Sequence, residues 1–277
     1  MSERLELLQA GRAVAALSVA VFHATLYTHA MPIEGFGFMG VHWGVHFFFL
    51  LSGFIIYHVN ADRSFAPGDY AFKRSVRIFI PYLPVGILAA FGWIAIGRDF
   101  SWLSTLFLVP GQAALGVAWT LQHEVMFYLL AGLFFMWGRP LTGAAIWAVL
   151  ILLRNGISIP VNPFEQVALG FINLEFVAGM FLAAFVSLPD VKVGRALNLL
   201  GDASYAIYLA HLPLMGVLFR LGGGFWTMLA LSVAAGLIYH LLFEKPALRW
   251  VRSSRFRERP AIGRVVARGD EDIVSGM

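Results

Sequence analysis

The stretch LQAGRAVAALSVAVFHA, residues 8–24, is apolar except for a few polar side chains, among them Arg12 and His23. A membrane-spanning helix needs about 20 mostly apolar residues, and residues 11–30 supply such a run. On a helix, residues 11 positions apart lie about 20° from eclipsed and about 16 Å apart along the axis. Arg12 and His23 therefore share one face, with the arginine at the cytoplasmic end and the histidine near mid-membrane.

A titratable side chain at mid-membrane is costly, which makes His23 a functional candidate. The alternative is structural: Arg12 snorkels to the membrane surface, and His23 forms a hydrogen bond inside the helical bundle.

The composition extends the membrane interpretation to the whole chain. Of the 277 residues, 59% are apolar, 15% aromatic and 13% charged, whereas a soluble domain has about 45–50% apolar and about 25% charged residues. The chain contains no cysteine, which excludes thiolate catalysis, a zinc–thiolate site and a disulfide framework. We expect no removable signal peptide, since no short hydrophobic core with a small-residue cleavage site opens the sequence.

The hydrophobic runs predict an all-α fold, a polytopic integral membrane bundle of about eight transmembrane helices, with a range of eight to ten. The expected spans are 11–30, 42–60, 78–97, 119–138, 141–153, 166–186, 198–221 and 225–243. Residues 100–118 are interrupted by Pro110, Gly111 and Gly116, so an interfacial or re-entrant element is expected there. Residues 1–250 are expected to form one membrane domain, followed by a basic, disordered cytoplasmic tail over 251–277.

The basic residues predict the orientation of these spans, because cytoplasmic loops are enriched in Lys and Arg. With eight spans and a cytoplasmic N-terminus, 17 of the 20 Lys and Arg residues fall on the cytoplasmic side, and only Arg98, Arg154 and Arg220 fall on the other. We therefore expect a multi-pass protein of a bacterial-type cytoplasmic (inner) membrane with both termini in the cytoplasm. The formal charge of +4 is then a topology signal and does not indicate nucleic-acid binding.

Polar groups on other spans stand at depths similar to His23. Thr120, Glu124 and Tyr128 follow one another at four-residue spacing on one face of the fourth span. A lone buried carboxylate is costly, and a carboxylate that holds one ring nitrogen of a histidine leaves the other to act as a base. We expect Glu124 to orient His23 in this way. Further polar or small candidates on other spans are His46, Gly53, Glu175 and His211. Structural hydrogen bonds between helices are the alternative for the whole cluster.

Arg74 and Arg77 are expected in a cytoplasmic loop close to the membrane surface. Basic residues in such a loop often signal only topology, but two guanidinium groups can also clamp phosphate oxygens. A nucleotide-like donor arriving from the cytoplasm would meet Arg74 and Arg77 first, then Arg12 and finally His23. This order describes a path for coenzyme A and its thioester.

Several segments, in this order, resemble the membrane acyltransferase-3 family. They are Arg12-x10-His23, GVHFFFLLSGF (44–54), RSVR (74–77) with PY (81–82), WTLQHEVMFYL (119–129), EFVAGM (175–180) and LGDASYAIYLAH (200–211). The Leu8–Gln9 opening, the W-T-L-x-x-E form and the G-D-A-S-Y run are most similar to the exopolysaccharide acetyltransferase branch. The resemblance covers about residues 7–250.

This resemblance implies transfer of an acyl group, usually acetyl from acetyl-CoA, to a hydroxyl of a sugar or another surface-glycan acceptor. Acyl-CoA is then a co-substrate, with no bound cofactor or metal. The essential histidine of the family matches His23, its paired arginine matches Arg12, and its donor-contacting pair matches Arg74 and Arg77. The chain departs from the family in having eight expected spans instead of about ten, His46 where many relatives carry aspartate, and no esterase-like domain after the last helix.

The expected mechanism is direct transfer, in which His23 removes the proton of an acceptor hydroxyl that attacks the thioester. Tyr128, Tyr205 or His211 would supply oxyanion donors. Ser52 is an alternative as a covalent acyl carrier, although small residues such as Ser52 and Gly53 more often permit close helix packing. The supporting or acceptor-side candidates are His46, Ser52, Gly53, Trp119, Tyr128, Glu175, Tyr205 and His211.

Two other classes of protein compete with the enzyme. A mid-membrane histidine also suits the proton relay of a transporter, but the inverted repeats and paired broken helices common in transporters are not evident. The third class is a scaffold subunit of a polysaccharide export complex. The expected partners are acyl-CoA, the hydroxyl acceptor, the lipid bilayer and proteins of polysaccharide synthesis or export, without nucleic acid.

The orientation is testable with single cysteines, because the native chain has none. Cysteines at Lys73 and Ser254 are expected to react with an impermeant thiol reagent only after the membrane is permeabilised. A cysteine within residues 31–40 is expected to react in intact cells. The reverse pattern would overturn the orientation and the assumed route of the donor.

Overall fold

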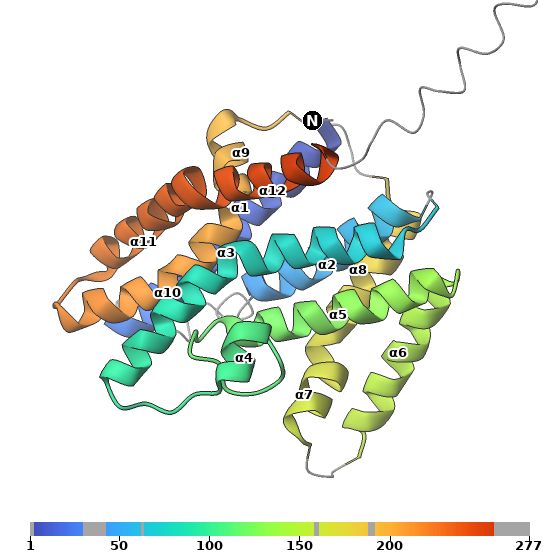
Figure 1. The fold of residues 1–277 in the computed structure, drawn as a ribbon, viewed down its shortest axis with the longest axis horizontal. Coiled ribbons are helices and arrows are strands. Elements are labelled where there is room, and N and C mark those ends of the chain that lie inside the picture. The colour runs from blue at the N-terminus through green and yellow to red at the C-terminus, as the bar shows by residue number, and fades with distance from the viewer. Residues whose placement is uncertain (1–2, 30–42, 62–63, 158–160, 188–191, 258–277) are drawn as a thin grey trace, which may run out of the picture.

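The structure, a computed structural model, describes residues 3–29, 43–61, 64–157, 161–187 and 192–257. Every regular element in these ranges is helical (Figure 1). In chain order they are α1 (Glu3–Thr28), α2 (Trp43–Asn60), α3 (Pro67–Ala95), α4 (Trp102–Phe107), α5 (Ala118–Met136), α6 (Pro140–Asn155), α7 (Pro163–Leu169), a 3₁₀ turn (Phe171–Asn173), α8 (Leu174–Phe185), α9 (Arg195–Asp202), α10 (Ser204–Arg220), α11 (Phe225–Tyr239), a π turn (His240–Glu244) and α12 (Lys245–Arg257). The all-α prediction is confirmed.

Five helical segments are long and apolar enough to cross a membrane, namely Glu6–Thr28, Trp43–Asn60, Pro67–Ala95, Pro163–Phe185 and Phe225–Ser254. A sixth results if α9 and α10, which are bent by 64°, form one span. Helix α6 is shorter, and α5 is made more polar by Gln122, His123 and Glu124. The structure therefore supports a multi-pass bundle, but the expected count of eight is not confirmed.

The structure corrects the expected position of Arg74 and Arg77. The span was expected to begin at residue 78, with Arg74 and Arg77 in a loop. Instead, α3 begins at Pro67, with proline in its first turn, and Arg74 and Arg77 lie inside the helix. Proline fits this position because the first helical N–H has no intrahelical partner. The two arginines are therefore held on a rigid element.

Residues 98–117 form the non-spanning element expected around Phe100–Ala118. The short helix α4 is capped by Ser101, whose side chain accepts a hydrogen bond from the Ser104 amide at 3.2 Å. The irregular chain after α4 buries Leu108, Leu115 and Val117 against the core. This segment closes one end of the bundle beside α3 and α5 (Figure 1).

An aromatic stack joins four helices in the core. Phe49 of α2 stacks on Phe176 of α8 at 4.3 Å between ring centroids, and Phe176 stacks on Phe127 of α5 at the same distance. Phe127 in turn lies parallel to Trp147 of α6 at 6.3 Å. Buried aromatic side chains contribute large apolar areas in offset or stacked geometries. The stack fixes α5, which carries Glu124, relative to α2.

Helices α2 and α8 touch backbone to backbone at two glycines. A Cβ atom on Gly53 would collide with the Phe176 carbonyl oxygen, and one on Gly179 would collide with the Leu50 carbonyl oxygen. Small residues at helix interfaces allow this approach in membranes. The packing role weighed for Gly53 in the sequence is confirmed.

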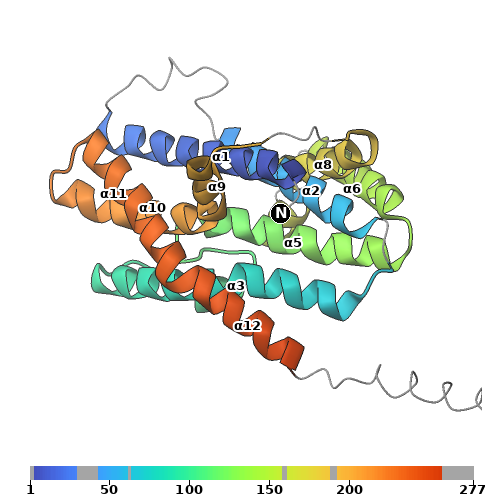
Figure 2. The same ribbon diagram turned by 90° about the horizontal axis from the view of Figure 1, so that it is seen from above.

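The outer surface of the bundle is apolar, as a lipid-facing surface must be. Leu88 and Phe91 on α3, Leu129 on α5, and Trp226 and Leu242 in the last span are more than half exposed. A soluble monomer rarely exposes so many large apolar side chains. Helix α3 lies alongside α5, and the last span crosses α3 obliquely (Figure 2).

The end of the chain differs from the expected domain boundary. The tail was expected to begin at residue 251, but α12 continues to Arg257. Residues 258–277, and the loop 31–40 chosen for cysteine labelling, lie outside the described residues.

We predict that Gly179→Ala lowers the melting temperature of the protein in detergent, because overpacking a tight contact costs about 1–3 kcal/mol. Gly92→Ala is the matched control: Gly92 also lies inside a helix, and nothing stands within 4 Å of its added Cβ. Alanine there is expected to be neutral or slightly stabilising. Equal melting temperatures for the two variants would contradict the close approach of α2 and α8.

Candidate active site

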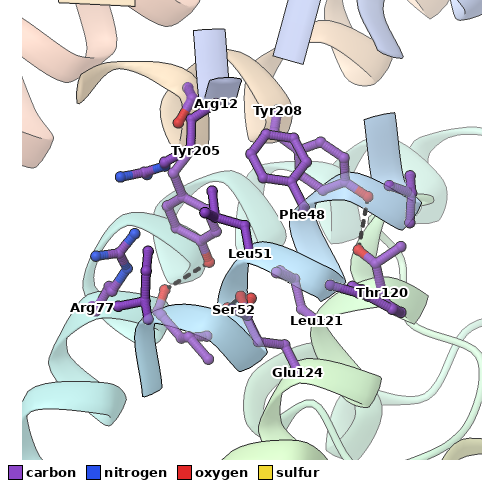
Figure 3. A pocket seen from close by; sticks show the side chains of 15 residues that line it. Arg12, Phe48, Leu51, Ser52, Arg77, Thr120, Leu121, Glu124, Tyr205 and Tyr208 are labelled. Carbon is purple, nitrogen blue, oxygen red and sulfur yellow. Dashed lines mark hydrogen bonds between the residues drawn. The ribbon is translucent and has the colours of Figure 1, made fainter. Parts of the chain in front are cut away.

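A cavity of about 70 Å³ lies inside the bundle where α1, α2, α3, α5 and α10 meet (Figure 3). Its walls combine charged, hydroxyl and apolar side chains. The residues that line it are Arg12, Val45, Phe48, Phe49, Leu51, Ser52, Ile55, Arg77, Ile78, Thr120, Leu121, Glu124, Ser204, Tyr205 and Tyr208. Five of the residues selected from the sequence meet here: Arg12, Arg77, Glu124, Ser52 and Tyr205.

Two arginines from different helices face this cavity. The guanidinium groups of Arg12 and Arg77 repel one another, whereas the carboxylates of Glu124, Asp202 and Glu244 attract Arg12. In Figure 3 both guanidinium groups lie on one side of the cavity, away from the Thr120–Tyr208 hydrogen bond. Cationic donors that converge in this way form a binding site for an anion.

Glu124 has partners other than the one expected from the sequence. Its Oε1 atom accepts hydrogen bonds from the Ser52 hydroxyl at 3.1 Å and from the Tyr128 hydroxyl at 2.5 Å. Ser52 and Glu124 both line the cavity, whereas His23 is not among the lining residues. Glu124 therefore stands in a serine–glutamate–tyrosine cluster, and its expected role in orienting His23 stays a prediction.

Arg74 and Arg77 point to different surroundings. Arg77 lines the cavity, while the guanidinium of Arg74 lies over the rings of Tyr70 at 5.8 Å and Tyr128 at 5.5 Å. Cation–π contacts of this kind occur within about 6 Å of the ring centroid. Arg74 therefore stands beside the glutamate cluster and Arg77 stands in the cavity.

His23 pairs with His211 of α10. The Nδ1 atom of His23 lies 2.9 Å from the Val19 carbonyl oxygen and 3.3 Å from Nε2 of His211. The Nδ1 atom of His211 lies 2.7 Å from the Tyr208 carbonyl oxygen. A carbonyl only accepts, so each neutral ring carries its proton on Nδ1. The lone pair of His23 is then on Nε2, the atom that can take a proton.

Tyr208 connects the cavity to the histidine pair. Its hydroxyl shares a 2.7 Å hydrogen bond with Thr120, and its carbonyl oxygen holds His211. Tyr208 lines the cavity, and its ring centroid lies 5.7 Å from that of His211. Tyr208 therefore stands between the two parts of the site.

The three expected oxyanion donors are already engaged. Tyr128 donates to Glu124, Tyr205 donates to the Ile78 carbonyl oxygen at 3.1 Å, and His211 donates to Tyr208. Among the residues that line the cavity, Arg12 and Arg77 are the cationic donors.

His46, Glu175 and Trp119 lie apart from the cavity lining. His46 forms a short hydrogen bond with Glu175 across the α2–α8 contact, the same contact at which Gly53 lies. Trp119 is 41% exposed and packs edge-on against His123, whose Nδ1 donates to Asn173 at 3.0 Å. These groups connect α2, α5 and α8 and do not meet Glu124.

Sequence reasoning missed two parts of the charged network. Gln9 and Asp202 form a hydrogen bond of 2.8 Å, and both stand in motifs that had been noted only for their resemblance. In the π turn, His240 donates to Glu244 at 2.7 Å, and both side chains are 7% exposed. Their four-residue spacing was the available signal. Within the ranges that the structure describes, no group of three or more His, Asp or Glu residues is arranged to hold a metal ion.

Comparison with known proteins agrees with the architecture. The profile of an acyltransferase domain matches residues 6–186, which is more than half of the chain. The chain therefore belongs to the acyltransferase-3 family, a class of membrane acyltransferases. It is 27% identical to the exopolysaccharide production protein ExoZ of Rhizobium meliloti (strain 1021), over 82% of this chain and 96% of that protein. No solved structure matches.

Proposed function

We propose that this protein is an O-acyltransferase that moves an acyl group, acetyl in the first instance, from acyl-CoA to a hydroxyl of a cell-surface or exported glycan. The observation that carries the proposal is the convergence of Arg12 of α1 and Arg77 of α3 on one cavity, with His23 further along the same helix as Arg12. Membership of the acyltransferase-3 family supports the reaction class. The similarity to ExoZ, an exopolysaccharide production protein, supports a glycan acceptor.

The donor site of this proposal is the arginine side of the cavity. Acyl-CoA carries phosphate groups, and guanidinium groups bind phosphate oxygens as planar, charged donors. Arg12 and His23 are separated by about 16 Å along α1. An extended pantetheine arm that starts at Arg12 and Arg77 would run along α1 past Tyr208 and bring the thioester toward His23.

The chemical step is assigned to His23 with His211 as its support. The Nε2 atom of His23 takes the proton of the acceptor hydroxyl, whose oxygen forms a bond to the thioester carbonyl carbon. The carbon–sulfur bond then breaks, and the thiolate of coenzyme A leaves and receives the proton from His23. His211 keeps His23 in the required tautomer through the Nδ1 contact of 3.3 Å. Glu124 offsets the charge of Arg12 and holds Ser52 and Tyr128.

The orientation completes the proposal. Both termini are assigned to the cytoplasm, where acyl-CoA is available, in a bacterial-type inner membrane. The distribution of basic residues supports this orientation. The acceptor would then reach His23 from the opposite side, so donor and acceptor would approach from different compartments.

Transfer itself can be measured in proteoliposomes or membranes supplied with radiolabelled acetyl-CoA and the host polysaccharide. Label on the polysaccharide, sensitive to mild alkali as an oxygen ester is, is the expected result. A transporter or a scaffold subunit would leave the polysaccharide unlabelled, and that result would contradict the proposed function.

We predict that His23→Ala reduces transfer about 10²- to 10⁴-fold, the range for loss of a general base. His211→Ala is expected to reduce kcat less, and the double variant should resemble His23→Ala because residues that act as a unit are non-additive. Transfer is measured at matched amounts of membrane-inserted protein. Multiplicative losses in the double variant would show that the two histidines act separately.

We also predict that Arg77→Gln raises the KM for acetyl-CoA about 10- to 100-fold, since hydrogen bonds to charged groups contribute about 1.5–3 kcal/mol. The effect on kcat should be smaller, because contacts remote from the thioester give uniform binding. Arg74→Gln is the internal comparison and should raise the KM less, because Arg74 lies over two tyrosine rings and is not among the cavity-lining residues. An unchanged KM for Arg77→Gln, at normal protein level, would remove Arg77 from the donor site.

A further inference from the structure

The first helix and the short helix α9 touch next to Arg12. A Cβ atom on Gly201 would collide with the backbone of Gln9, so the two helices approach more closely than any larger residue at 201 would allow. The contact is reinforced nearby, where the Val193 amide donates to the Glu6 carboxylate at 2.8 Å. Residues 187 and 193 positions apart in the sequence are thus fixed side by side.

A chain of two hydrogen bonds crosses this contact. Arg12 Nη1 donates to Gln9 Oε1 at 3.1 Å, and Gln9 Nε2 donates to Asp202 Oδ1 at 2.8 Å. A carboxylate can only accept, and a guanidinium can only donate. Asp202 therefore forces the NH₂ group of the Gln9 amide toward itself and the amide oxygen toward Arg12. Only one of the two amide orientations satisfies both neighbours.

The side-chain amide of Gln9 also leaves the positive charge of Arg12 in place, which a carboxylate at position 9 would not do. A glutamate there would pair directly with Arg12 and neutralise it, and it would compete with any anionic ligand. The neutral amide orients the guanidinium and leaves its charge in place. The carboxylate of Asp202 lies further from Arg12 than the Gln9 amide does, because Gln9 stands between them. Arg12 is thus aimed at the cavity as a cation.

We propose that Asp202 and Gln9 are positioning residues that hold Arg12 in a fixed orientation, still charged, for a phosphate group of acyl-CoA. This inference rests on the proposed function, because the ligand class comes from it. It assigns a role to the Leu8–Gln9 opening and to the G-D-A-S-Y run that begins at Gly201, two sequence features that the reaction itself did not use. We refer to Arg12, Gln9 and Asp202 as the relay.

The test uses isosteric variants, which keep the shape of the site. Gln9→Glu should raise the KM for acetyl-CoA about tenfold or more, because it replaces a neutral contact to Arg12 with a direct ion pair. Asp202→Asn should raise the KM by about three- to tenfold, because the Gln9 amide can then also adopt the flipped orientation, in which its NH₂ group faces Arg12. In both variants kcat should change less than KM. Binding of coenzyme A alone, measured calorimetrically on the purified protein in detergent, should weaken in parallel.

Gln166→Glu is the matched control for added charge, since Gln166 is exposed on α7 and does not line the cavity. It should leave the KM and the coenzyme A affinity unchanged. Combining Asp202→Asn with Arg12→Gln should add little to the effect of Arg12→Gln alone, because the relay acts only through Arg12.

The outcomes separate this inference from the function on which it rests. If Arg12→Gln raises the KM while Gln9→Glu and Asp202→Asn leave it at the wild-type value, the donor site stands and the relay is wrong. The relay would also be overturned if Asp202→Asn multiplied the rise in KM that Arg12→Gln causes alone. If Arg12→Gln also leaves the KM and the coenzyme A affinity unchanged, the donor site fails together with the relay. If no acetyl group reaches the polysaccharide even with the wild-type protein, the proposed function itself fails.

Discussion

The positive charge of Arg12, held inside an apolar helical bundle, is the constraint on which the rest of the site depends. A charge removed from water costs several kcal/mol unless nearby groups offset it. The offset comes from carboxylates on three elements far apart in the sequence: Glu124 on α5, Asp202 on α9 and Glu244 in the π turn. Helices α9, α10 and α11 accordingly pack against α1. The packing of these helices brings the three carboxylates close to the guanidinium group of Arg12.

The site has two parts that are joined by Tyr208. One part is the cavity with Arg12, Arg77 and Glu124, and the other is the histidine pair His23–His211. Tyr208 lines the first part and holds the second through its carbonyl oxygen. The groups that we propose to bind the donor and those that we propose to transfer the proton thus stand in different parts of the bundle. This separation suits a reaction whose two substrates arrive from opposite sides of a membrane.

Much of this arrangement follows from local rules that a sequence displays. Helical spacing predicted that Arg12 and His23 share one face of α1, and composition indicated a helical membrane bundle. The pairing of side chains between helices could not be predicted in the same way, because it depends on which helix faces which. Glu124 was expected to orient His23; the hydrogen bonds that the structure shows join Glu124 to Ser52 and Tyr128, and His23 to Val19 and His211. Similarly, Arg74 and Arg77 were assigned to a loop because a hydropathy criterion excludes charged residues from a membrane span. The helix itself is not limited in this way, and α3 begins earlier, at Pro67.

The position of the π turn limits how the chain can be shortened. The matched acyltransferase domain ends at residue 186, whereas Asp202, His211 and Glu244 all follow it. A fragment cut at that boundary would keep Arg12 and His23 but would lose two counter-charges and the histidine partner. The positive charge of Arg12 would then lack two of the three carboxylates that offset it. The smallest autonomous unit must therefore extend at least through Glu244, so the homologous core and the folding unit have different lengths.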